Sequence, residues 1–357
     1  MRITVVLSLC VWLVFQGKVL AQCGFPTMDN LDDVLKIYAN SPDSTNSGAR
    51  EDVEKILSGY LDPLVWAVNS GSANSWYNTA KTHEMFGFDV NASVSIAWVP
   101  MKDYGYLLND TSLNTVNVVY PPRGSVEEDT RLSTFMGDIE TPVFQSKDGR
   151  YTYNGIPGTG LKRRFGLGVI PLPVLQGGVG LPSGTDVKIR LSPPIMFGNR
   201  DVLLYLGGIG VMHDISQYLN LKDDFEDMSI SGFAGYTMLN MRTRLSDQPF
   251  DFSQVSRFNF HSITSQVVAS LPVSIVTIYS GLGATYTNMR FRILGEYNID
   301  NDPTTFELKD PVDFSKFHIY PKATAGAMLK FSVITVSLDY SFQRYHALTF
   351  GVGYTVN

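Results

Sequence analysis

A strict alternation of apolar residues with small or polar ones, sustained over whole segments, constrains this chain most. Residues 89–98, 334–342 and 347–356 each alternate in this way. Because successive side chains of a β-strand point to opposite faces, each segment is predicted to be a strand with one apolar and one polar face. Weaker segments of the same kind recur between residues 168 and 329. From about residue 86 onward the chain is therefore expected to be all-β and antiparallel.

Alternation alone does not say which face is wet. A water-soluble sandwich or barrel buries its apolar faces, whereas a transmembrane barrel turns them toward lipid and its polar faces toward the lumen. The expected strands have about 10–13 residues, closer to the ~9–11 of membrane strands than to the ~5–6 of globular ones. Aromatic residues also gather near strand ends, where membrane barrels carry interfacial girdles. These residues are Trp98, Tyr340, Phe342, Tyr345 and Tyr354.

Connections between the expected strands alternate between short and long ones, as in membrane barrels. Tight turns are expected at residues 270–272 and 330–332. Long polar connections are expected near residues 100–114, 121–165, 214–227 and 298–316. The chain after residue 86 allows an even number of strands, about 12–14 at ~20 residues per strand and connection. The expected fold class is therefore an antiparallel transmembrane β-barrel of about 12–14 strands.

The N-terminus predicts export. Arg2 precedes a mostly apolar run from residue 3 to residue 15, and residues 19–21 form a cleavage site. This pattern is typical of a cleavable signal peptide over residues 1–21, and the apolar run is too short for a membrane span. Residues 20–23 can alternatively be interpreted as a lipoprotein box with Cys23 lipidated. Gln22 is a poor residue before such a cysteine, so cleavage after Ala21 is preferred.

The net charge of the chain argues against a nucleic-acid partner. Without the signal peptide the chain has 26 basic and 34 acidic residues, a net charge of −8. Nucleic-acid binding needs clustered Lys and Arg, so no nucleic-acid partner is expected. Cys10 leaves with the signal peptide, and Cys23 is then alone. No intramolecular disulfide can form.

Residues 22–85 are expected to form an N-terminal helical, hatch-like segment that precedes a barrel over residues 86–357. From Val53 to Val68, apolar residues recur at spacings of three and four, the pattern of an amphipathic helix. Pro63 falls inside this run and is expected to break it. The apolar stripe needs a partner. The pattern leaves open whether these helices plug the barrel lumen or pack on each other in the periplasm.

Several short motifs resemble a known family. Residues 75–80 (Ser-Trp-Tyr-Asn-Thr-Ala), followed by His83 and Gly87-Phe88-Asp89, resemble a domain-of-unknown-function family of secreted outer-membrane β-barrel proteins from Bacteroidota. Residues 172–176, 180–190 and 213–217 agree with it. The resemblance runs from about residue 45 to the end and implies a barrel in the cell outer membrane. The family carries no activity that could be transferred.

A more remote similarity concerns the segment before the barrel. A helical N-terminal segment followed by Tyr77-Asn78-Thr79-Ala80 and a barrel is similar to the long-chain fatty-acid and hydrocarbon transporter family of the outer membrane. The similarity implies an N-terminal hatch that enters the lumen, with an Asn-Pro-Ala motif closing its base. This chain has Asn78-Thr79-Ala80 instead and departs from the motif at the proline.

Enzyme signatures are scarce in this sequence. The five histidines are scattered without metal-ligand spacing, and nothing selects a nucleophile, a base and an orienting group. Leu206 to Gly210 mimics a phosphate-binding loop, but no Lys-Ser or Lys-Thr follows it. Glycines in strands more often mark close packing. We therefore expect no enzyme activity, and no catalytic, cofactor-binding or metal site.

The candidate functional residues belong to the hatch-like segment or to the polar faces of predicted strands. They are Trp76, Tyr77 and Asn78 of the segment, and Asp89, Asn91 and Asp339 of the strands. A barrel of this size encloses a lumen wider than its side chains fill. The first hypothesis is therefore an outer-membrane channel or hatch-gated transporter for small solutes, hydrophobic and amphipathic ones included. Outer-membrane lipid and a small hydrophobic solute are the implied partners.

Two other hypotheses remain open. A plugged barrel would act as a structural or surface-interaction protein through its loops at residues 121–165 and 298–316, without transport. A soluble periplasmic β-sandwich would bind a ligand and would be extracted without detergent. The substrate, the gating mechanism and the oligomeric state have no signal in the sequence.

Overall fold

The computed structural model describes residues 28–39, 47–120, 131–160, 168–197, 202–219, 227–245, 252–298 and 307–356. The expected signal peptide and Cys23 lie outside these residues, as do parts of the long connections. Two α-helices, α3 (Met28–Ala39) and α4 (Ser47–Ser72), precede the strands. In the described part of the chain, neither helix combines the length and hydropathy needed to cross a bilayer.

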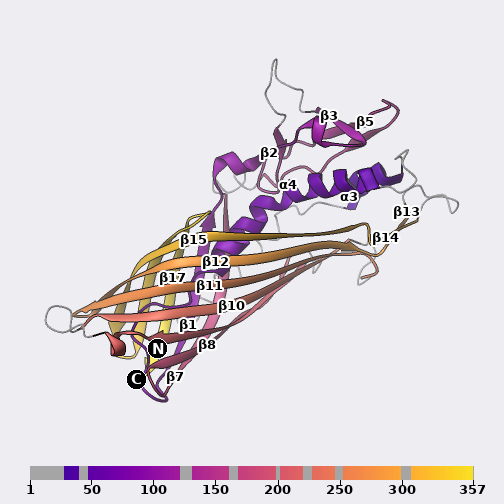
Figure 1. Ribbon diagram of the computed structural model, residues 1–357. Coiled ribbons are helices and arrows are strands. Elements are labelled where there is room, and N and C mark those ends of the chain that lie inside the picture. Colours follow the sequence, from indigo (N-terminus) through magenta and orange to yellow (C-terminus); the bar gives the residue numbers. More distant parts are fainter. Residues whose placement is uncertain are drawn as a thin grey trace, which may run out of the picture.

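A closed antiparallel β-barrel forms the body of the molecule (Figure 1). Its strands are β1 (Phe88–Trp98), β7 (Val169–Leu181), β8 (Thr185–Phe197), β9 (Val202–Asp214), β10 (Ser229–Arg244), β11 (Val255–Val273), β12 (Val276–Leu294), β15 (Val312–Phe331), β16 (Ile334–Phe342) and β17 (Ala347–Val356). Consecutive barrel strands pair with each other, and β1 closes the ring by pairing with both β7 and β17.

The barrel confirms the expected fold class but not the strand number. Ten strands close the ring in the described residues, where about 12–14 were expected from an average spacing. Two features account for the difference. Strands β11, β12 and β15 have 19 or 20 residues each, and residues 99–120 and 131–160 lie outside the ring.

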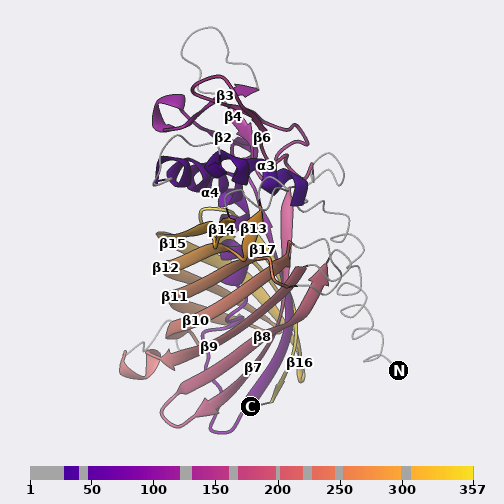
Figure 2. The same ribbon diagram turned by 90° about the vertical axis from the view of Figure 1, so that its right-hand side faces the viewer.

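The extra-barrel residues form small sheets at one end of the barrel (Figure 2). Their strands are β2 (Gly105–Leu107), β3 (Val116–Tyr120), β4 (Arg131–Ser133), β5 (Val143–Ser146) and β6 (Thr152–Asn154), with 3₁₀ turns η1 (Met101–Tyr104) and η2 (Asp110–Ser112). The hairpin β13 (Glu296–Asn298) and β14 (Glu307–Lys309) lies between β12 and β15, and η3 (Ser216–Tyr218) follows β9. We call residues 99–120 and 131–160, together with α3, the outer cap.

Tight turns lie at the opposite end of the barrel. They join β7 to β8, β11 to β12 and β15 to β16, and each contains a serine with positive φ, at Ser183, Ser274 and Ser332. The turn expected at residues 330–332 is therefore confirmed, because the observed turn lies within two residues of that position. The turn expected at residues 270–272 is wrong, because those residues belong to β11. Proline holds φ near −65°, so Pro272 cannot take the left-handed conformation that Ser274 adopts.

The barrel wall turns its apolar side chains outward and its polar ones inward. Ile319 and Leu282 are 70% and 69% exposed, whereas Thr285 and Asp339 on the inner face are 0% and 4% exposed. A protein in water would place these two sets the other way round. The outer face therefore has the character that a transmembrane barrel presents to lipid.

This inside-out pattern reverses toward the capped end of the long strands. On β12, the outward side chains change from Leu282 and Tyr286 to Asn288 and Arg290, while the inward ones become Met289 and Phe291. A strand of 20 residues extends over roughly 66 Å, against ~30 Å of bilayer hydrocarbon. The strands thus continue beyond the apolar belt as a sheet with an ordinary, apolar interior.

A photo-crosslinking measurement can check the assignment of the two faces. Phe350 is 48% exposed and its neighbour Thr349 is 2% exposed, and both belong to β17. A photoreactive amino acid at position 350 is expected to crosslink to lipid in a reconstituted bilayer, and the same group at position 349 is not. The opposite result would mean that the barrel is inside out.

Candidate functional site

The chain threads its own barrel between α4 and β1. Helix α4 begins beside the outer cap and runs into the capped end of the barrel (Figure 1). Residues 73–87, which we call the threaded segment, then continue along the lumen to the tight-turn end, where β1 begins. The lumen is therefore the candidate functional site, and the threaded segment is its principal occupant.

Helix α4 brings its apolar stripe into the outer half of the lumen. Val53, Leu57 and Leu64 are buried in one apolar cluster with inward side chains of the wall, among them Leu206 and Phe260. The reversal of the strand pattern supplies this apolar lining. The partner that the stripe requires is thus the barrel itself.

Pro63 does not break the helix as expected. Helix α4 runs through it from Ser47 to Ser72. A proline costs its helix a hydrogen bond and crowds the preceding turn. Here, carbonyls of that turn have other donors: Phe135 N donates to Tyr60 O at 2.9 Å, and Lys316 Nζ donates to Ser58 O at 3.4 Å. Contacts with the cap and the wall therefore stabilise a helix that its local sequence disfavours.

Arg190 on β8 anchors the start of the threaded segment. Its Nη1 donates to Asn74 O at 2.8 Å, and its Nη2 donates to Ser72 O and to Thr237 Oγ1. The guanidinium carbon also lies 3.6 Å from the centroid of the Trp76 ring. Arg190 is 1% exposed. One buried cation thus binds the last carbonyl of α4, a carbonyl of the segment and an aromatic face of the segment.

Glycines of the wall make room for the aromatic residues of the segment. Gly210 and Gly235 are paired across β9 and β10, and a Cβ at either would lie within 2.8 Å of the Trp76 ring. Trp76 is 1% exposed. Gly210 ends the run that mimics a phosphate-binding loop, and at this glycine the expected close packing is observed.

Tyr77 occupies a second site on the neighbouring strands β11 and β12. Its hydroxyl donates to Gln266 Oε1 at 3.0 Å, and its ring packs edge-on against Tyr279, 6.1 Å between centroids. Tyr279 in turn donates to Asp339 Oδ2 at 3.1 Å. Lys322 on β15 donates to Ala73 O at 2.5 Å. Wall and segment therefore share a polar network in the middle of the lumen.

The tight-turn end of the lumen carries a charged contact. His83 donates its backbone N–H to Asp186 Oδ1 at 2.9 Å, and its Nδ1 lies 2.8 Å from Asp186 Oδ2. Asp89 Oδ1 lies 3.8 Å from His83 Nε2 on the other side. Further bonds join Phe86 and Gly87 to Gly180. The segment is thus held at its exit as well as at its entry.

The structure places all six residues singled out from the sequence in or along the lumen. Trp76 and Tyr77 are buried and both contact Phe233, and Asn78 is half-buried on the segment between them and the exit. The other three are buried on inner faces of the wall: Asp89 and Asn91 on β1, and Asp339 on β16.

The sequence reasoning missed the basic wall residues that bind the segment. A signal exists in residues 186–190, where Asp186, Lys188 and Arg190 alternate with apolar Val187 and Ile189. In a strand, this spacing places all three charges on one face. Their buried position follows only if that face lines a lumen.

A buried carboxylate of α4 holds the outer cap. Asp52 is fully buried; Asn114 N, Thr115 N and the Thr115 hydroxyl each donate to it at 2.7 Å. Such charge-assisted bonds are worth about 1.5–3 kcal/mol each. Asp52 therefore fixes the start of β3 to the helix.

Replacing Asp52 with alanine is expected to loosen the cap while leaving the barrel intact. Three donors would lose their acceptor, at a cost of about 3 kcal/mol or more to the local structure. Hydrogen exchange should accelerate in residues 110–118 and stay unchanged in β10–β12. The variant Glu54→Ala, which removes a carboxylate of α4 that pairs with Arg50 of the same helix, is the control. Equal exchange in Asp52→Ala and wild type would contradict this role.

Comparisons with known proteins give one strong match. The model of the "Family of unknown function (DUF6588)" matches residues 5–356. No curated protein matches the chain. Solved structures with some likeness include three outer-membrane proteins, each with a low TM-score.

The translocator domain of the autotransporter NalP from Neisseria meningitidis has 10% identity and a TM-score of 0.30, covering 90% of this chain and 99% of its own. The attachment invasion locus protein Ail of Yersinia pestis has 8% identity and a TM-score of 0.26, covering 76% of this chain and 99% of its own. The toluene transporter TodX of Pseudomonas putida has 7% identity and a TM-score of 0.26, covering 81% of this chain and 96% of its own. Similarity at this level transfers no function. Because the family model spans nearly the whole sequence, the chain belongs to the DUF6588 family of unknown function.

Proposed function

We propose that this protein is an outer-membrane barrel closed by its own chain, which holds a folded cap on the cell surface for interaction with external molecules. The observation that carries the proposal is the bonding of the threaded segment. Strands on several sides of the lumen bond it: β1, β7, β8, β10, β11 and β15. A segment bonded to so many strands is expected to obstruct a permanent solute path through the lumen.

The orientation follows from a general property of membrane barrels. Their tight turns face the periplasm and their longer loops face outward. Three tight turns of this barrel, at Ser183, Ser274 and Ser332, share one end with the end of β17, and the outer cap lies at the other (Figure 2). In this orientation, lipid contacts the apolar belt of the wall, and the cap, with the beginning of α4, lies outside the cell.

Epitope tags test the orientation. A tag inserted at the exposed turn Asp148–Gly149 of the cap should bind antibody on intact cells. A tag at the Ser332–Val333 turn should bind only after the outer membrane is opened. The reverse pattern would overturn the proposal.

Liposome swelling tests the closure. The purified full chain is expected to give no more solute entry than empty liposomes, with an open porin as positive control. Solute entry through the wild-type protein would favour the alternative, a hatch-gated transporter in which the segment moves aside for small solutes, hydrophobic ones included. That outcome would overturn the proposal that the barrel is closed. The epitope tags would still test whether the cap lies on the cell surface.

A further inference from the structure

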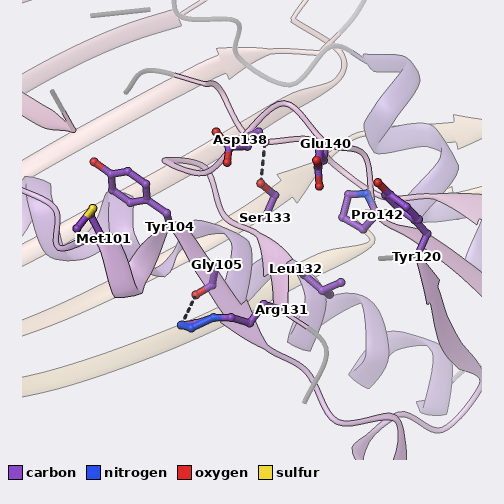
Figure 3. A pocket seen from close by; sticks show the side chains of 10 residues that line it. All are labelled: Met101, Tyr104, Gly105, Tyr120, Arg131, Leu132, Ser133, Asp138, Glu140 and Pro142. Carbon is purple, nitrogen blue, oxygen red and sulfur yellow. Dashed lines mark hydrogen bonds between the residues drawn. The ribbon is translucent and has the colours of Figure 1, made fainter. Parts of the chain in front are cut away.

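The outer cap contains a cavity of about 270 Å³ that is separate from the lumen (Figure 3). In this view Tyr104 and Tyr120 lie on opposite sides of it, with Asp138 and Glu140 along one edge and Arg131 along the other. Ser133 lies between them. Flat aromatic rings, hydrogen-bond donors and carboxylate acceptors thus surround one small space.

Backbone contacts keep the walls of this cavity in place. Gly105 pairs with Ser133 across β2 and β4. The carbonyl of Asp138 accepts from Ser133 Oγ at 2.7 Å and from Gly158 N at 2.9 Å. These bonds fix the main chain of Asp138 and leave its carboxylate exposed. A site held in this way needs little ordering when a ligand binds.

The charges of the lining restrict the ligand. Asp138 and Glu140 are exposed, and neither has an ion-pair partner in the described part of the chain; two carboxylates disfavour an anion. Arg131 disfavours a cation, and its Nη2 is held by Lys102 O at 2.7 Å. A neutral ligand that both donates and accepts hydrogen bonds can bind the carboxylates and the guanidinium without charge repulsion from either.

The tyrosines add an apolar surface and a hydroxyl. Burial, together with nearby Asp138, raises the pKa of Tyr104, so its phenol stays protonated at neutral pH. Sugar rings combine hydroxyl groups with flat apolar C–H faces, which pack on aromatic rings. The volume lies near the lower end of the ~300–1,000 Å³ range of ligand pockets, which suits one or two rings.

We infer that this cavity of the outer cap binds a neutral saccharide of one or two rings, with Asp138 and Glu140 accepting from ring hydroxyls and the tyrosines packing against the ring face. The inference deepens the proposed function, because it gives the surface cap a ligand class. Binding to purified protein does not depend on the orientation in the membrane.

Binding should be measured on the full chain in detergent by saturation-transfer NMR and titration calorimetry. The probes are glucose, galactose, mannose, N-acetylglucosamine, maltose and lactose, with glucuronic acid and glucosamine as anionic and cationic counterparts. At least one neutral sugar is expected to bind saturably and more tightly than either charged sugar. Binding by none of the neutral sugars, or tighter binding of a charged one, would overturn the inference.

Variants assign the binding to this cavity. The double variant Asp138→Asn/Glu140→Gln is expected to weaken binding about tenfold or more, since it removes two charged acceptors. Tyr120→Ala should weaken it as well. Asp148→Asn, an exposed carboxylate of the cap outside the cavity, is the control and should bind like wild type. Unchanged binding by the double variant refutes this site, whereas a reversed result with the epitope tags would refute only the proposed orientation.

Discussion

Single-channel recordings of the Arg190→Ala variant are expected to show openings that the wild-type protein lacks. Arg190 donates to carbonyl oxygens of Ser72 and Asn74 and stacks on Trp76. Without it, both carbonyls stay in the lumen without this donor, and the indole loses its cation. Hydrogen bonds to a charged group contribute about 1.5–3 kcal/mol each.

The size of the effect follows from these contacts. If detachment of the threaded segment becomes easier by about 3 kcal/mol, its detached population rises roughly 100-fold. Total stability should change less, because the variant also removes the cost of burying a charge that has no ion-pair partner among the described residues. Hydrogen exchange in residues 73–77 should therefore accelerate much more than exchange in β11 and β12.

Arg290→Ala is the matched control for this experiment. Arg290 lies on β12, is exposed, and pairs with Asp313 of β15 rather than with the segment. Its removal should leave both the recordings and the exchange of residues 73–77 as in wild type. If Arg190→Ala behaves like Arg290→Ala, Arg190 does not hold the segment.

The variant Gly235→Leu is expected to expel Trp76 from the lumen wall. A Cβ at position 235 would lie 2.7 Å from the Trp76 ring and 2.6 Å from Phe233, so a leucine and the indole cannot share this space. Removing a large aromatic side chain from its buried site costs about 3–5 kcal/mol. The Trp76 fluorescence should shift to longer wavelength and become accessible to iodide, in a background with Trp66 and Trp98 replaced by phenylalanine.

Gly207→Leu provides the control, because a Cβ there meets no atom within 4 Å. Gly207 lies on β9, on the outer face, three residues from the Trp76 site at Gly210. This variant introduces the same side chain into the same sheet and should leave the fluorescence unchanged. Unaltered Trp76 emission in Gly235→Leu would show that the indole does not depend on this site.

The sequence predicted the wall of the barrel better than its contents. In β17, apolar residues from Leu348 to Val356 alternate without interruption with small or polar ones. This period of two residues predicts both the strand and the face that it turns outward. The strand number was missed because β12 and β15 reverse their pattern partway along. At that point an apolar residue changes from an outward to an inward position, and the alternation no longer marks a single strand.

The bonds inside the lumen could not be predicted, for a different reason. Arg190 and Lys322 bind backbone carbonyls, and a carbonyl is present at every residue. No spacing of side chains therefore identifies Ser72, Ala73 or Asn74 as partners. Pro63 shows the same limit: the turn before it is held in part by Phe135, far along the chain, which donates to the carbonyl of Tyr60.

A ring that encloses its own chain restricts the order of assembly. β1 follows directly from the threaded segment and also pairs with β17, so the seam can close only after β17 has been synthesised. In the proposed orientation, α3 and the beginning of α4 must reach the far side of the membrane before or during that closure. A folded cap, with its own buried Phe135 and Phe144, is not expected to pass through a ring that its own chain already fills. Translocation must therefore precede folding of the cap. Insertion of the barrel into the membrane and folding of the cap outside it are then coupled steps.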